Sequence, residues 1–133
     1  MGDAITLQGE ATEVAVTLRR VLDPAPAGPT DRTLRSGARF VGLELTIRNI
    51  GEARFDESPL ADAELISSRG RGDPVTLIGG PCATRFASHL SLRPGDGDEG
   101  CIVFELARGA RPLELRFALD SGFAPERGSW KLG

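Results

Sequence analysis

The chain has 133 residues, of which 16 are Lys or Arg and 19 are Asp or Glu, and its formal net charge is -3. This length suits one domain with a real hydrophobic core and is too short for two independent ones. The balanced charge excludes the basic field that binding to a phosphate backbone requires, so no nucleic-acid partner is expected. The longest apolar runs span only a few residues, whereas a membrane-spanning helix needs about 20.

The amino-terminal half begins with two segments of β character, followed by a loop. A first strand is predicted at residues 4–7. The apolar positions of residues 14–22 fit both a helical period and a strand period of two. We favour a strand, because the β-branched residues of this segment lose rotamer freedom in a helix. Residues 23–36, with three prolines and no apolar periodicity, are expected to form an exposed loop.

Three further segments carry the clearest strand patterns. Residues 41–47 and 113–119 alternate apolar with polar or small side chains, which puts the apolar set of each strand on one face. Residues 100–106 form the third strand, after a turn at residues 94–97. Its inward face is expected to hold Ile102, Phe104 and Leu106, and its other face Cys101, Val103 and Glu105.

Weaker strands are predicted where short apolar runs lie between Gly, Pro or Asp residues. These runs are residues 63–67, 74–78, 88–92 and 129–132. Regular short strands with frequent turns are typical of an antiparallel sandwich or barrel. Neither an internal repeat nor a linker interrupts the pattern. We therefore expect an all-β fold in which residues 1–133 form one domain.

Several strand and turn motifs resemble those of a known family. They are residues 2–7, residues 39–45, Asn49 with Gly51, residues 94–96 leading into 103–105, and residues 119–123 before Trp130. Over nearly its whole length the chain resembles bacterial secreted or membrane-anchored domains of unknown function that are related to the mycobacterial immunoprotective extracellular protein. The resemblance implies an immunoglobulin-like antiparallel β-sandwich of two sheets with about eight to ten short strands. It implies no catalytic residues.

The resemblance also sets expectations about location and partners. Family members are typically exported behind a signal or lipoprotein segment and a flexible stalk, so we expect the protein outside the cytoplasmic membrane. The first residues of this chain carry no such signal, and a natural start at Met1 would instead place the protein in the cytoplasm. The expected partner is another protein or a cell-envelope component, and no cofactor is expected. A telomeric repeat-binding factor-like label sometimes given to the family gains no support from the charge balance.

An alternative function is that of a small-ligand or calcium-binding carrier. A cavity lined by Phe40, Phe104 and Phe117 would favour a carrier, whereas a filled core with an exposed apolar patch would favour a protein partner. Calcium ligands could come from either of two acidic turns. The first holds Asp96, Asp98 and Glu99, and the second Asp56, Glu57 and Asp62. Neither fits the EF-hand spacing, and acidic residues beside Gly and Pro are ordinary turn formers.

Cys82 and Cys101 are the only cysteines, and an even number in a chain that resembles exported proteins predicts a disulfide. Closing a loop of this size would stabilise the fold by roughly 3 kcal/mol in the chain-entropy model. Because Cys101 is predicted on the face opposite the core, the bridge should hold residues 79–85 against the outside or edge of a sheet. Two buried free thiols are one alternative. A zinc site that also used His89 is another, one ligand short of a closed site.

No set of residues marks a catalytic site. A hydrolytic triad would have to use His89, the single histidine, and neither Ser58 nor Ser121 lies in a nucleophile-elbow motif. The glycine-rich residues 70–72 and 79–80 lack the Lys and the helix of a phosphate-binding loop. We therefore predict a binding or structural module that is not an enzyme.

Overall fold

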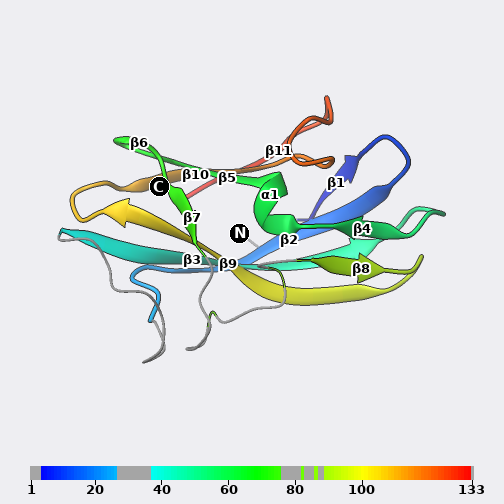
Figure 1. The fold of residues 1–133 in the computed structure, drawn as a ribbon, viewed down its shortest axis with the longest axis horizontal. Helices are drawn as coiled ribbons and strands as arrows, with labels where there is room; N and C mark the ends of the chain where they lie inside the picture. The colour runs from blue at the N-terminus through cyan, green and yellow to red at the C-terminus, as the bar shows by residue number, and fades with distance from the viewer. Residues whose placement is uncertain (1–3, 27–36, 76–81, 83–85, 87–88, 133) are drawn as a thin grey trace.

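The computed structural model describes residues 4–26, 37–75, 82, 86 and 89–132, and this part of the chain is mainly β-structure, as predicted. Figure 1 shows two layers, with β10, β5 and β11 in one and β2, β3 and β9 in the other. The elements are β1 (Ala4–Gln8), β2 (Glu13–Leu22), β3 (Ala38–Asn49), β4 (Phe55–Glu57), α1 (Pro59–Asp62), β5 (Ala63–Ser67), β6 (Gly70–Arg71), β7 (Asp73–Val75), β8 (Leu90–Leu92), β9 (Gly97–Ala107), β10 (Pro112–Phe117) and β11 (Gly128–Lys131).

The strands of the described residues form two large antiparallel sheets and one small one. The first sheet has five strands in the order β1-β2-β3-β9-β7, and the second has four in the order β11-β10-β5-β6. A separate two-stranded sheet pairs β4 with β8. The longest pairing joins β3 to β9, from Ala38 opposite Ala107 to Arg48 opposite Gly97. The strand with the clearest alternation in the sequence is therefore the middle strand of the larger sheet.

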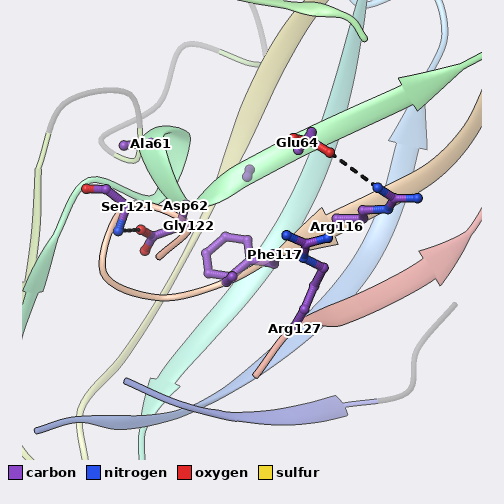
Figure 2. A pocket seen from close by; sticks show the side chains of 10 residues that line it. Ala61, Asp62, Glu64, Arg116, Phe117, Ser121, Gly122 and Arg127 are labelled. Carbon is purple, nitrogen blue, oxygen red and sulfur yellow. Dashed lines mark hydrogen bonds and ion pairs between the residues drawn. The ribbon is translucent and has the colours of Figure 1, made fainter. Parts of the chain in front are cut away.

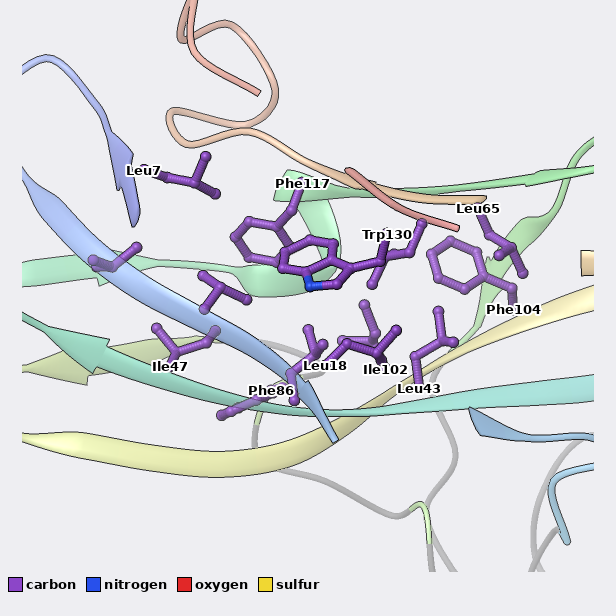
Figure 3. Packing of buried hydrophobic residues seen from close by; sticks show 14 of the residues in the cluster. Leu7, Leu18, Leu43, Ile47, Leu65, Phe86, Ile102, Phe104, Phe117 and Trp130 are labelled. Carbon is purple, nitrogen blue, oxygen red and sulfur yellow. The ribbon is translucent and has the colours of Figure 1, made fainter. Parts of the chain in front are cut away.

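The core fills the space between the two large sheets. The predicted strand at residues 41–47 is confirmed, and residues 14–22 form a strand and not a helix. Ile102, Phe104 and Leu106 of β9 face the core, as predicted. The four-stranded sheet contributes Leu115 and the labelled Leu65, Phe117 and Trp130 of Figure 3. Burial of this apolar surface, at about 25 cal/mol per Å², is the dominant stabilising contribution.

A smaller apolar cluster covers the outer face of the five-stranded sheet. Its members are Ala25, Phe40, Val75, Cys82, Cys101 and Val103. Phe40 therefore does not face inward with Phe104 and Phe117, which belong to the core cluster, so the three residues do not line the common cavity that would favour a carrier. The reason is the strand period: Val41 faces the core, so its neighbour Phe40 faces the other way.

Some predicted elements differ from the structure. The strand expected at residues 113–119 is shorter, because β10 ends at Phe117. Leu113 is 36% exposed, because a register shift between Pro112 and Glu114 interrupts the alternation there. Three short elements, β4, α1 and β6, carry no periodic pattern and escape prediction. The predicted strands at residues 74–78 and 88–92 and the loop at residues 23–36 lie partly outside the described residues.

α1 is the one helix among the described residues, and it carries the chain from β4 to β5. Pro59 suits its first turn, where the N–H that proline lacks would have no helical partner. The last residue, Asp62, is buried and is followed directly by β5. This short helix therefore places a carboxyl group inside the protein. No helix in the described part of the chain is long and apolar enough to cross a membrane.

Candidate functional site

The loop between β10 and β11 has the most constrained backbone in the described structure. Asp120 and Ser121 both have φ of 56°, and Gly122 follows with φ of 87°. Two consecutive residues with side chains in this left-handed region are rare and carry a conformational cost. Backbone hydrogen bonds close the turn: the Phe123 N–H donates to the Asp120 carbonyl oxygen (3.1 Å), and the Ala124 N–H donates to the Leu119 carbonyl oxygen (3.0 Å). The loop is a defined structure that surrounding groups must stabilise.

Three carboxyl groups supply that stabilisation. The Asp120 N–H donates to Glu57 Oε1 and the Ser121 N–H to Asp62 Oδ1, each at 2.8 Å. Figure 2 shows the second of these bonds, between the loop and the end of α1. Asp120 in turn accepts the N–H of Glu10 at 2.8 Å, which ties the loop to the β1–β2 turn. The β10–β11 loop is thus anchored to two separate elements.

Asp62 is the most perturbed titratable group in this anchor. Its side chain is 3% exposed, and Oδ2 has no hydrogen-bond partner. Burial is the largest cause of the rise in the pKa of Asp62 to about 9; the adjacent Glu57 carboxyl adds to the rise, and the Ser121 N–H opposes it. Asp62 therefore carries a proton at neutral pH. The neutral form puts no second negative charge beside Glu57, which explains how two acids lie side by side.

A small hollow of about 190 Å³ lies beside Asp62. Arg116 lines it and forms ion pairs with Glu114 and, at 3.5 Å, with Glu64. Figure 2 shows Arg127 extending next to the Phe117 ring. A buried acid with a raised pKa can serve as a general acid. The lining, however, offers one hydroxyl and no histidine, which is not the set that acyl transfer requires.

Two larger hollows adjoin the β1–β2 turn, and one of them also borders the β10–β11 loop. One of about 460 Å³ lies between the β1–β2 turn and the β10–β11 loop, and one of about 730 Å³ lies between that turn and the β3–β4 loop. We call the surface around both hollows the loop end; it comprises residues 8–13, residues 50–53, Asp120 and residues 123–126. Phe123, which is 87% exposed, projects here. Sequence reasoning missed this site, because the sequence around Phe123 does not distinguish it from an aromatic residue of the core. The difference lies in the left-handed backbone of residues 120–122, which only the structure shows.

The acidic turns of the sequence do not gather into a metal centre. Asp56 of β4 forms an ion pair with His89, the residue before β8, and both side chains are about half exposed. Asp56 therefore lies apart from the contacts that Glu57 and Asp62 make with the loop. In the other turn, Asp98 Oδ1 accepts the N–H of Glu99 at 2.9 Å. Among the described residues, no group of three or more His, Cys, Asp or Glu residues could hold a metal ion.

The remaining sequence candidates also lie apart. His89 makes no hydrogen bond to Ser58 or Ser121 in the described structure, so the residues of the hypothetical triad are not assembled. Cys82 and Cys101 form a disulfide with a Cα–Cα distance of 5.1 Å, and a bridged pair has no thiolate to offer to zinc. The bridge lies in the outer cluster, on the face of β9 away from the core. Gly42 of β3 lies beneath it, where a Cβ atom would overlap the Cys82 sulfur.

The family model that describes a domain of unknown function, DUF4352, matches residues 8–126. The chain belongs to this family. No curated protein sequence matches that of this DUF4352 domain. The family description names no activity, and it does not carry the telomeric repeat-binding label.

Solved structures of low sequence identity share the fold of the DUF4352 domain. The secreted protein MPT63 of Mycobacterium tuberculosis has a TM-score of 0.67 and 12% identity, with 98% of this chain and 93% of that chain covered. The yjhA protein of Bacillus subtilis has a TM-score of 0.68 and 16% identity, with 100% and 98% covered. The candidate lipoprotein ycdA of Bacillus subtilis has a TM-score of 0.72 and 13% identity. That likeness covers 97% of this chain, which spans 38% of the ycdA chain. The shared fold is an immunoglobulin-like β-sandwich.

Proposed function

We propose that residues 1–133 form one non-enzymatic binding module, exported or membrane-anchored, which contacts another protein of the cell envelope through the loop end. The observation that carries the proposal is the placement of Phe123. This aromatic side chain is 87% exposed, whereas Phe40, Phe55, Phe86, Phe104 and Phe117 are buried. The loop that presents it is held by the Glu57, Asp62 and Asp120 carboxyl groups.

A binding role accounts for two costs that the loop imposes on the fold. An exposed aromatic ring contributes nothing to core burial, and left-handed conformations at Asp120 and Ser121 are unfavourable. Aromatic side chains that are ordered before association are effective anchors in protein interfaces, because little side-chain freedom is lost on binding. The anchored loop fixes the backbone that carries the exposed Phe123 ring.

The proposed location has separate support. Disulfides persist mainly outside the cytoplasm, and this small protein has one. Two proteins of similar fold are named as a secreted protein and a candidate lipoprotein. The rival function, a carrier with a ligand between the sheets, has less support. Phe104 and Phe117 are fully buried in the packed core, and Phe40 lies in a different cluster.

Site-specific photo-crosslinking tests the proposal. A photoreactive phenylalanine analogue replaces Phe123 in the protein produced in its native host, and Leu113, an exposed apolar residue on β10, is the matched control position. We expect a discrete crosslinked envelope protein from position 123 and none from position 113. The proposal fails if position 123 gives no crosslink, or if both positions give the same products.

A further inference from the structure

From the charge and shape of the loop end, we propose that its partner is a protein segment in which Lys or Arg side chains flank an apolar side chain. This inference rests on the proposed function and adds the chemistry of the partner. It depends on three features of the loop end: the sign of its charge, its exposed apolar residues and the hydrogen bonds that fix its carboxylates.

The charge of the loop end is of one sign. Five of the residues that line its two hollows are acidic, and no lining residue is Lys or Arg. The acids are Glu10, Glu13, Glu52, Asp120 and Glu126. The chain as a whole is nearly balanced, with 16 basic and 19 acidic residues. The acidic lining is therefore a local feature that favours a cationic partner and disfavours an anionic one.

Apolar side chains lie within this acidic surface. Ile50, Leu113 and Phe123 are the large hydrophobic residues exposed in the described structure. Ile50 lines the larger hollow and Phe123 the smaller one, and both hollows share Gln8, Gly9 and Glu10. Two of the three exposed apolar residues thus flank one turn. An apolar centre with a charged rim is the usual arrangement of a protein interface.

Several carboxylates of the loop end are already held in place. Glu126 Oε1 accepts the N–H of Gln8 at 3.2 Å, and Glu13 Oε2 accepts the Gln8 side-chain amide at 3.2 Å. Asp120 Oδ2 accepts the Glu10 N–H at 2.8 Å. Groups ordered before binding lose little freedom when a partner arrives. The same negative charge disfavours an anionic lipid surface, so a protein segment is the better match for the exposed Phe123.

Titration with defined peptides tests the inference. The first probe is a short Gly-Ser peptide that carries Leu-Lys pairs; the second has Glu in place of Lys, and the third has Ser in place of Leu. Amide NMR shifts of the isotope-labelled protein report the binding site. We expect the Leu-Lys peptide to shift the amide signals of residues 8–13, 50–53 and 120–126. The protein should bind either altered peptide at least about tenfold more weakly. Its affinity for the Leu-Lys peptide should fall by a similar factor at about 0.5 M salt.

Charge variants supply the matched comparison. Glu10→Gln, Glu52→Gln and Glu126→Gln together remove three charges from the loop end and keep an amide oxygen to accept the Gln8 N–H. Glu44→Gln, Glu64→Gln and Glu99→Gln together change the net charge equally on β3, β5 and β9. We expect only the first triple variant to weaken Leu-Lys peptide binding, by about tenfold.

Several results would overturn the inference. One is that the Glu-containing peptide binds as tightly as the Leu-Lys peptide, and another is that both triple variants lose the same affinity for the Leu-Lys peptide. A third is that the protein binds phosphatidylglycerol vesicles and not the Leu-Lys peptide. A fourth is that calcium chloride alone produces the NMR shifts expected for the Leu-Lys peptide. The two proposals fail separately. A crosslink from position 123 to a partner, together with equal binding of the Glu-containing peptide, would leave the proposed function standing and reject its cationic partner.

Discussion

Asp62 shows how a single buried acid determines the pH dependence of the anchor. Its pKa is raised from 3.8 to about 9 in the folded protein, so between these values the folded state holds a proton that the unfolded chain has released. The contribution of Asp62 to stability is therefore most favourable below about pH 4 and declines as pH rises toward 9. Glu57, Asp120 and the Ser121 N–H are the groups that face it.

Substitution of this acid tests the assignment of the proton. Asp62→Asn stays neutral and keeps an oxygen for the Ser121 N–H. We expect the variant to exceed wild type in free energy of unfolding at pH 8 by at least about 1 kcal/mol, with the difference shrinking toward pH 4. Urea unfolding across this pH range measures it. Asp56→Asn, on an exposed carboxyl, is the control, and a difference that does not vary with pH would contradict the assignment.

Gly42 supports the disulfide through its missing side chain. A Cβ atom there would overlap the Cys82 sulfur, would lie 2.9 Å from the Cys101 sulfur, and would lie 3.3 Å from Ala25 Cβ. Gly42→Ala should therefore destabilise the oxidised protein by about 1–3 kcal/mol. The loss should be smaller in a Cys82→Ala, Cys101→Ala background, where the sulfurs are absent. A double-mutant cycle from urea unfolding measures this coupling, and additive losses would show that the sulfurs are not the obstacle.

At the level of elements, the disulfide attaches Cys82 to β9. The two residues are 19 positions apart, so their cross-link removes freedom from the unfolded chain. Replacing both with Ala should lower the free energy of unfolding by roughly 3 kcal/mol. The fold should remain, because the main core lies on the other face of the sheet. Circular dichroism with urea checks both points. Two reactive thiols in the denatured, non-reduced wild-type protein would show that the bridge does not form.

The same elements show what the sequence can and cannot reveal. Strands β2, β3 and β9 are long, and alternate apolar residues of each face the core, so alternation predicts them. Leu113 is misplaced because a register shift depends on the pairing with β5, which no local pattern contains. The anchor of the β10–β11 loop joins Asp120 to Glu57 and Ser121 to Asp62, about 60 positions away in the chain. Such contacts follow only from the folded arrangement of the sheets.

At the level of the whole molecule, the residues that hold the sheets together and the residues that the proposal assigns to binding are separate sets. The core lies between the two large sheets, whereas the loop end uses turns at their border. Phe123 and Ile50 are exposed and add little to core burial. Stability and binding should therefore respond to different substitutions.

Phe123→Ala tests this separation most directly. Because the ring is 87% exposed, its removal should change the free energy of unfolding by no more than about 0.5 kcal/mol. The same substitution should weaken Leu-Lys peptide binding by about tenfold or more, since an anchoring aromatic is lost. Leu113→Ala, the exposed control on β10, should change neither quantity. If Phe123→Ala destabilises the protein as much as it weakens binding, the ring supports the loop and is not a contact for a partner.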